Sequence, residues 1–317
     1  MRNQRLAASF GMVNARCAFI AACVAGLLLS FVSCASTGAV KKDVKTGNEF
    51  AELPPGALTY IRFDVKPSRG LLDGFLTRHR LNTKTLKTFF DRTDTAVAAV
   101  YPKLAGESGT GTRRFLLAAY GKNYPAALSS FSLFFNPAWK KTRSVTGKKY
   151  WRSPKNGVSL FMQRDKARIS DADPFFIEDG VETPVIFRIF SADADVSAWI
   201  TKPDFLDKAL ARMDIPITIP ATGLFISASA HEKGWKVDFR LETPGRAQAR
   251  GLVSVLALVK NALDRAYIKD AGIAALARLL LSEPPSVDDN ALILRCPAIP
   301  EATLAGLIAS FSIQLNR

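Results

Sequence analysis

Histidine is scarce in this chain, and so are the sequence patterns of known catalytic sites. Only His79 and His231 occur among 317 residues, and neither has the HxxxH or HExxH spacing of zinc sites. The chain has no GxSxG motif, and its glycine-rich segment 106–112 lacks the Lys-Ser/Thr pair of a phosphate-binding loop. We therefore predict a protein that is not an enzyme and that uses no metal or other cofactor.

The apolar run near the N-terminus, residues 17–32, is short. It spans 16 residues, whereas a helix needs about 20 apolar residues to cross the hydrocarbon core of a bilayer. Three arginines and no acidic residue precede it. A basic segment followed by a short apolar run and small residues is typical of a secretory signal, which begins at Met1 or at Met12. A permanent transmembrane anchor is the less favoured alternative.

The apolar run leads into the sequence Phe31-Val32-Ser33-Cys34. This sequence resembles a lipobox, the recognition site of bacterial lipoprotein signal peptidase, in the relaxed form of spirochaetes. The resemblance implies that the peptidase recognises Phe31, Val32 and Ser33, removes residues 1–33, and leaves a lipid-modified Cys34 as the N-terminus. Two or more acyl chains anchor a protein stably, whereas one chain does so only marginally. An ordinary secretory signal, with an incidental cysteine, is the alternative.

The other cysteines offer no intramolecular disulfide. Cys17 and Cys23 belong to the predicted signal, so Cys296 remains as the only free thiol once Cys34 is lipidated. Stability must then come from packing, which a chain that is 48% hydrophobic can provide. Residues 34–50 are mostly small, polar or charged, and they predict a flexible tether between the anchor and the folded body.

The sequence after residue 50 predicts an α+β fold built from two similar modules. Residues 51–170 and 185–317 each follow an approximate β-α-β-β-α-β order, and an acidic linker with two prolines, residues 171–184, separates them. In each module we expect an antiparallel sheet with amphipathic helices packed on one face.

Several individual elements are also predicted. Residues 57–65 alternate apolar and polar side chains, which is typical of a half-buried strand with Arg62 on its polar face. Residues 194–199 are expected to be helical. Paired strands are expected at 157–163 with 166–170, and at 221–230 with 234–242.

Two predicted helices carry apolar stripes at helical spacing. They consist of Leu252, Val255, Leu256, Val259 and Leu263 in the stretch 246–281, and of Leu304, Leu307, Ile308 and Phe311 at the C-terminus. Apolar faces with cationic flanks can lie in a membrane interface or line a cavity for an acyl chain. Packing of the helices against a sheet is the alternative.

Positive charge is in excess, because 43 Lys and Arg outnumber 28 Asp and Glu. Such a chain is attracted to anionic lipid, acidic cell-wall polymers or nucleic acid, and export argues against nucleic acid. Residues 139–155 concentrate the charge, with three aromatic residues and no acid among them. A solvated hairpin without a binding role is the alternative. The candidate contacts with an anionic surface are Lys140, Lys141, Arg143, Lys148, Lys149 and Arg152.

These features lead to one functional hypothesis and one alternative. We predict an exported, non-catalytic lipoprotein anchored through Cys34 in the cell envelope, at either membrane or at the cell surface. Its body would bind lipid or another amphiphile, or contact the membrane through amphipathic helices. In the alternative, its basic surface would bind a partner protein or an anionic cell-wall polymer. Neither hypothesis involves nucleic acid or metal.

Overall fold

Twelve strands dominate the described part of the chain. The computed structural model describes residues 48–78, 84–102, 113–124, 139–153, 157–176, 187, 193–204, 206–207, 218–232, 234–265 and 278–300. In the first predicted module the strands are β1 (Thr59–Asp64), β2 (Thr93–Pro102), β3 (Arg113–Gly121), β4 (Lys140–Arg143), β5 (Lys149–Arg152), β6 (Ser159–Met162) and β7 (Lys166–Ser170). In the second they are β8 (Val196–Thr201), β9 (Gly223–His231), β10 (Gly234–Glu242), β11 (Ser286–Asp288) and β12 (Ala291–Arg295).

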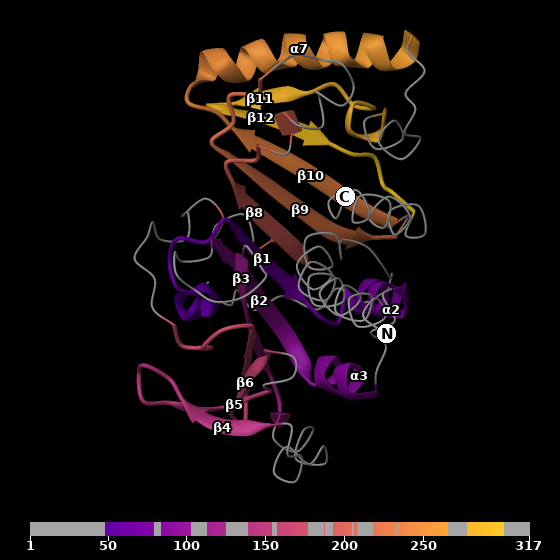
Figure 1. The fold of residues 1–317 in the computed structure, drawn as a ribbon. Helices are drawn as coiled ribbons and strands as arrows, with labels where there is room; N and C mark the ends of the chain where they lie inside the picture. The colour runs from indigo at the N-terminus through magenta and orange to yellow at the C-terminus, as the bar shows by residue number, and fades with distance from the viewer. Residues whose placement is uncertain are drawn as a thin grey trace, which may run out of the picture.

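These strands form one sheet, in the order β11-β12-β10-β9-β8-β1-β2-β3-β7-β6-β5-β4 (Figure 1). The predicted hairpins are confirmed as β6–β7 and β9–β10, and both are antiparallel. The sheet continues from one predicted module into the other because β1 pairs with β2 on one side and with β8 on the other. In the antiparallel register Ile61 lies opposite both Ala98 and Ala198. Residues 171–195, which include the predicted linker, connect β7 to β8.

The predicted α+β fold of two modules with helices on one face is wrong. The described residues form a single antiparallel sheet, and their helices are η1 (Asn48–Glu52), α2 (Arg69–Arg78), α3 (Lys84–Asp91) and α7 (Arg246–Arg265). Two separate sheets would leave β1 and β8 as open edges, whereas their pairing satisfies the backbone groups of both. Residues 194–199, predicted as helical, contribute to β8, where Val196 and Ala198 are fully buried and favour a strand through packing.

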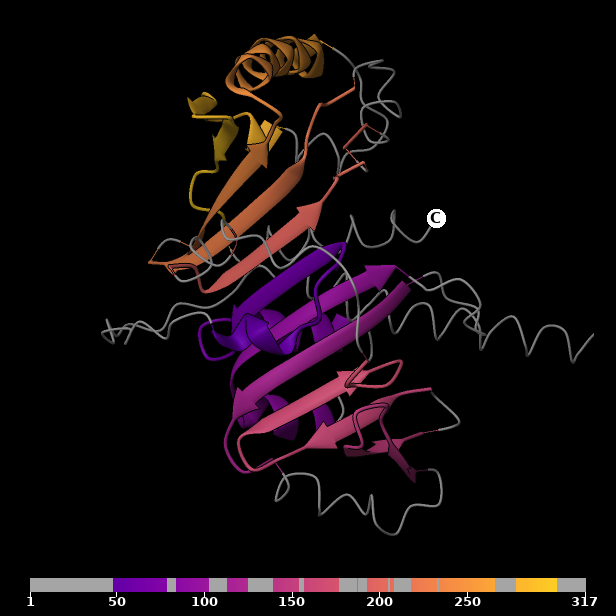
Figure 2. The ribbon, with the colours of Figure 1, turned by 90° about the vertical axis from the view of Figure 1, so that its left-hand side faces the viewer.

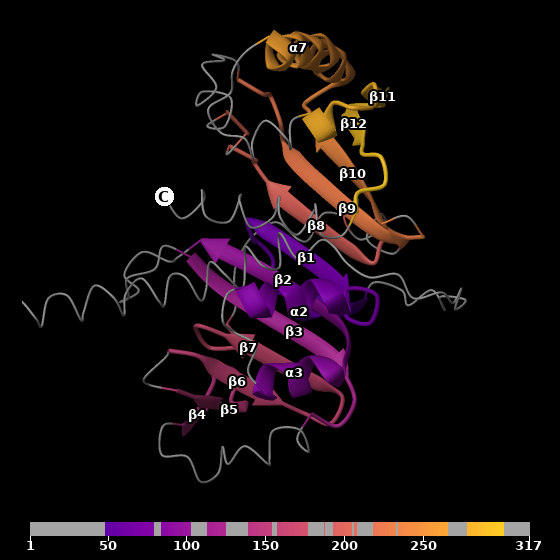
Figure 3. The same cartoon turned by 90° about the vertical axis from the view of Figure 1, so that its right-hand side faces the viewer.

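Side chains on the two faces of the central strands enter two different cores, because successive residues of a strand point to opposite faces. Helices α2 and α3 cover one face (Figure 3), and η1 covers the other (Figure 1). The α2–α3 core includes Ile61, Phe63, Leu71, Leu72, Phe89, Ala98 and Leu117. The η1 core includes Phe50, Leu53, Tyr60, Val97, Leu116 and Phe187.

Arg62 departs from the prediction of a half-buried strand. It is only 8% exposed, and its guanidinium pairs with Glu49 at 3.3 Å and with Asp64 at 2.9 Å. It also donates to the carbonyl oxygen of Ala194 at 3.1 Å. A charge leaves water only when such partners replace its hydration. Helix η1 therefore buries the polar face of β1 and supplies a counter-ion for it.

Helix α7 packs at the end of the sheet formed by β11 and β12, away from β4 (Figures 1 and 2). Leu252 anchors it and is 4% exposed, in a cluster with Leu224, Leu241 and Leu292. Burial of the apolar side of α7 against the sheet is the main stabilisation available to such a helix. Within the described ranges, no helix combines the length and the apolar character needed to span a membrane.

Candidate functional site

Several predicted site residues lie outside the described part of the chain. They are the predicted recognition and lipidation residues Phe31, Val32, Ser33 and Cys34, and the C-terminal stripe Leu304, Leu307, Ile308 and Phe311.

The predicted apolar stripe on α7 is described only in part, and its described residues are buried to different degrees. Leu252 is buried in the core, and Leu256 is partly buried against the same cluster. Val255 is also only partly exposed. The backbone at Val259 and Leu263 is helical, but their side chains lie outside the described part. The described end of the stripe thus faces the sheet.

The six predicted cationic residues lie together on one hairpin, which we call the basic hairpin. It consists of β4, β5 and the turn between them, and it lies at the opposite end of the sheet from α7 (Figure 3). All six cationic side chains are exposed. None forms a salt bridge with any residue in the described ranges, so their charge is not neutralised by a described neighbour.

Two like-charge pairs cross this hairpin. In its register Lys140 lies opposite Arg152, and Arg143 lies opposite Lys149. Cross-strand neighbours have Cβ atoms about 4.5–5.5 Å apart, and like charges at that distance destabilise a sheet. Because the free hairpin gains nothing from this arrangement, an anionic surface that neutralises both pairs would relieve a cost already present in the fold.

The aromatic residues of the segment hold the hairpin to the sheet. Tyr150 is 4% exposed, and Trp139 and Trp151 pack partly against the α2–α3 core. The Nζ of Lys141 lies 5.9 Å from the ring centroid of Trp151. These rings therefore fix the hairpin to the body and leave its cations to face solvent.

The turn of the basic hairpin, residues 144–148, presents one apolar side chain. Val145 is 79% exposed, and no other large hydrophobic residue in the described ranges is classed as exposed. The backbone N–H of Val145 donates to a carboxylate oxygen of Asp173 at 3.1 Å. Gly147 has a φ of 80°, which glycine adopts without strain. The turn is thus shaped by its own residues and by contacts with the segment that contains Asp173.

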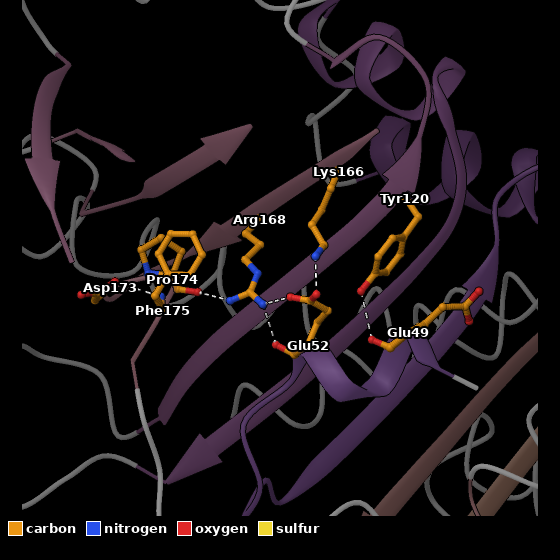
Figure 4. Close-up of polar contacts among 8 residues, drawn as sticks. All are labelled: Glu49, Glu52, Tyr120, Lys166, Arg168, Asp173, Pro174 and Phe175. Atoms are coloured by element: carbon orange, nitrogen blue, oxygen red, sulfur yellow. Dashed lines mark hydrogen bonds and ion pairs between the residues drawn. The ribbon is translucent and has the colours of Figure 1, made fainter. Parts of the chain in front are cut away.

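A chain of contacts links this turn to β7 and η1, and Figure 4 shows the part of it that lies between Asp173 and Glu49. The other carboxylate oxygen of Asp173 accepts the backbone N–H of Phe175 at 2.8 Å. The ring of Phe175 contacts two cations, Lys148 at 4.7 Å and Arg168 at 4.8 Å from its centroid. Arg168 also donates to the carbonyl oxygen of Pro174 at 2.8 Å. The turn at 173–175 therefore links the tip of the hairpin to β7.

The far end of this chain of contacts is η1. The carboxylate of Glu52 forms ion pairs with Lys166 and Arg168, and Tyr120 donates its hydroxyl hydrogen to the carbonyl oxygen of Glu49 at 3.0 Å. Burial opposes ionisation of Glu52, but the hydrogen bonds from Lys166 and Arg168 outweigh it and lower its pKa. Burial, with the nearby charge of Glu52, raises the pKa of Tyr120. Helix η1 is therefore fixed to the sheet by charge as well as by packing.

Little in the local sequence points to these supporting residues. Asp173 precedes Pro174, a pair that favours a turn, but the partner of its carboxylate lies 28 residues away on another hairpin. A still larger separation hides the role of Glu52, because its partners Lys166 and Arg168 in β7 lie 114 and 116 residues away. Pairings of this kind depend on strand order, which no local pattern encodes.

His231 and Cys296 are described residues that lie outside this site. His231 is exposed at the end of β9, and no cluster of three or more His, Cys, Asp or Glu side chains in the described ranges could hold a metal. Cys296 is 5% exposed. Its burial, together with the charges of Asp238 and Glu283, raises its pKa to about 12, so this thiol is protonated at neutral pH.

Comparison with known proteins gives a match in fold. No known protein family matches the chain, and no curated protein matches it. Crystal form I of TP0453 superposes with a TM-score of 0.53 and 16% identity, covering 83% of this chain and 96% of that chain. Crystal forms III and IV of TP0453 each give 0.50 and 15% identity, covering 83% and 86% of this chain and 98% and 100% of theirs. The chain therefore shares the overall fold of TP0453 over most of the length of both.

Proposed function

We propose that this protein is a non-catalytic lipoprotein of the cell envelope, anchored by lipid on Cys34, whose body binds an anionic membrane surface through the basic hairpin. The observation that carries the proposal is the arrangement of six exposed cations on one hairpin, without a salt bridge to any residue in the described ranges and with like charges opposed across the strands.

The energetics favour lipid as the anionic partner. A lysine or arginine near an anionic membrane contributes about 1 kcal/mol, and this attraction decays within a Debye length of the surface. The six cations of the hairpin therefore attract the body only over short distances, so their effect is greatest when the body is held close to the membrane. The lipid on Cys34 would provide that proximity.

The setting of this proposal rests on the N-terminal sequence. The lipobox resemblance of Phe31-Val32-Ser33-Cys34 supports export and lipid anchoring, whereas the match to TP0453 is one of fold. Replacing Cys34 by Ala should abolish incorporation of a clickable fatty acid. Labelling that persists in this variant would contradict lipidation at Cys34.

The test of the hairpin uses the chain from Ala35 onward, which keeps every described residue and lacks the lipid. We expect it to co-sediment with vesicles containing 30% phosphatidylglycerol and to dissociate from them as the salt concentration is raised. It should not co-sediment with vesicles of phosphatidylcholine alone. Replacing Lys140, Lys149 and Arg152 by Gln should weaken the sedimentation by at least tenfold, since roughly 3 kcal/mol of attraction is removed.

A matched control removes equal charge elsewhere. Lys87, Lys122 and Lys236 are exposed on α3, after β3 and on β10, and Gln at these positions should leave sedimentation nearly unchanged. Equal loss in both triple variants would indicate that net charge, and not the hairpin, determines binding. If neither the parent chain nor the variants sediment, the membrane proposal fails, and the alternative of a partner protein or cell-wall polymer takes its place.

A further inference from the structure

We infer that the tip of the basic hairpin enters the headgroup layer of the bilayer, with Val145 as the inserting side chain. This inference rests on the proposed function, because the cations must first bring the hairpin to the membrane. It adds a direction to that contact, in which the turn between β4 and β5 points into the lipid.

The position of Val145 is the first argument. An exposed valine is ordinary on a protein surface, but this one is 79% exposed at the tip of a turn, with exposed Arg143, Lys148 and Lys149 close by in sequence. A single exposed apolar side chain with cations on both sides in sequence suits the layered chemistry of a bilayer interface, where phosphates lie outside the acyl chains. Long cationic side chains can reach back to the phosphates while the tip goes deeper.

The backbone of the turn is the second argument. A loop entering lipid must leave few polar groups without a partner. Here the Ser144 N–H donates to the Lys148 carbonyl at 2.8 Å, and the Gly147 N–H donates to the Ser144 carbonyl at 2.9 Å. The Lys148 N–H donates to the Ser144 Oγ at 3.0 Å. The Val145 N–H donates to Asp173 at 3.1 Å. Four donors at the tip are thus already satisfied, which lowers the cost of leaving water.

Rigidity of the turn is the third argument. The hydroxyls of Ser144 and Thr146 lie 2.8 Å apart within hydrogen-bond range, and the Lys148 ammonium lies over the ring of Phe175 at 4.7 Å. A turn held in one conformation loses little conformational entropy when it binds. Asp173 acts as a positioning residue, because it holds the tip from the neighbouring segment.

The experiment places a fluorescent reporter at the tip of the chain from Ala35 onward. Val145→Cys gives one accessible thiol, since Cys296 is buried, and it is labelled with an environment-sensitive dye. Lys87→Cys on α3 is the matched control. On vesicles with 30% phosphatidylglycerol we expect a blue shift and a rise in emission for the dye at 145 only. Quenching should be stronger from lipids spin-labelled near the headgroup than from lipids labelled deep in the chain.

Unlabelled variants test the same step independently. Val145→Ser should weaken vesicle binding about three- to tenfold, and Val145→Leu should strengthen it, in proportion to the apolar area that leaves water. The dependence of binding on salt should stay unchanged in both, because no charge is altered. An unshifted dye at 145 on vesicles that still sediment the protein would overturn insertion and leave the proposed function intact. Loss of all sedimentation, measured in the same samples, would overturn both.

Discussion

Relieving the like charges of the basic hairpin should stabilise the fold while it weakens membrane binding. The perturbation is the double variant Lys140→Gln and Lys149→Gln, which leaves one cation in each of the two cross-strand pairs. Glutamine keeps a flexible polar side chain, one atom shorter than lysine, without the charge, and both positions are exposed. The core contacts of Tyr150 and Trp151 are not touched.

The magnitude follows from the geometry of the pairs. Two unit charges at the Cβ separation of about 5 Å would repel by roughly 0.8 kcal/mol in water before screening by salt, which is an upper limit because long exposed side chains can move their charges apart. Measured cross-strand pairs lie at about 0.2–1 kcal/mol. Relief of two exposed pairs should therefore raise the free energy of unfolding by about 0.5–1 kcal/mol at 10 mM salt. The gain should shrink to about a quarter of that or less at 0.5 M salt, where the Debye length falls well below 10 Å.

Urea unfolding at both salt concentrations measures the gain, and vesicle sedimentation measures the loss of binding. The control variant, Lys87→Gln with Lys122→Gln, removes the same charge from two exposed positions on other elements. It should change neither quantity by more than a few tenths of a kcal/mol. A hairpin variant that is no more stable than the parent at low salt would refute the argument that the pairs are strained. One that is stabilised but binds vesicles as before would refute their role in binding.

Four further predictions follow from the structure. Glu52→Gln should lower the free energy of unfolding by about 1 kcal/mol at pH 7. Because the pKa of Glu52 is lowered in the folded protein, its stabilisation is present above the ordinary pKa of 4.5 and is lost as pH falls through the lowered value. Urea unfolding from pH 7 to 3 should therefore show the stability difference between parent and variant disappearing. Leu252→Ala should cost about 2–3 kcal/mol and leave sedimentation of the folded protein unchanged, whereas weakened sedimentation would favour a membrane contact for α7. Gly121→Ala should cost about 2–3 kcal/mol in thermal unfolding, because a Cβ would lie 1.9 Å from the carbonyl oxygen of Arg92. Cys296 should react with iodoacetamide at pH 8 at least about a hundredfold more slowly folded than in urea, given its raised pKa of about 12; equal rates would contradict its burial.

Local patterns predicted the elements of this fold better than their assembly. Hairpins β6–β7 and β9–β10 and the basic hairpin follow from alternation and turn residues within about 20 residues of chain. The pairing of β1 with β8 joins residues more than 130 positions apart. No periodicity in either strand specifies that neighbour, so two modules with separate sheets looked equally consistent with the sequence.

Burial on both faces of β1 explains a second difference. Alternation of Phe63 with Arg62 indicates one apolar face, and the sequence alone places the arginine in water. In the structure, Glu49 and Asp64 accompany Arg62 under η1. An arginine is tolerated either in water or in a buried position where acidic partners replace its hydration. The sequence of one strand does not show which of these two environments the arginine has. The exposure of the six cations was predictable for the opposite reason, because cations without acids nearby in sequence have few ways to be neutralised within the fold.

The proposed anchor changes how strong the hairpin needs to be. Residues 34–47 lie between the predicted lipid and the first described residue, and a chain of that length reaches at most about 50 Å. A site confined within such a distance of its target experiences an effective concentration in the millimolar range. A hairpin that binds free vesicles only at millimolar lipid would therefore still be bound for about half of the time when the chain is anchored. Weak binding by the chain from Ala35, and membrane contact for about half of the time by the lipidated chain, are thus both expected. On the same vesicles, the blue-shifted fraction of the dye at position 145 should be larger for the lipidated chain than for the chain from Ala35. Equal occupancy in both would mean that the anchor does not assist the hairpin.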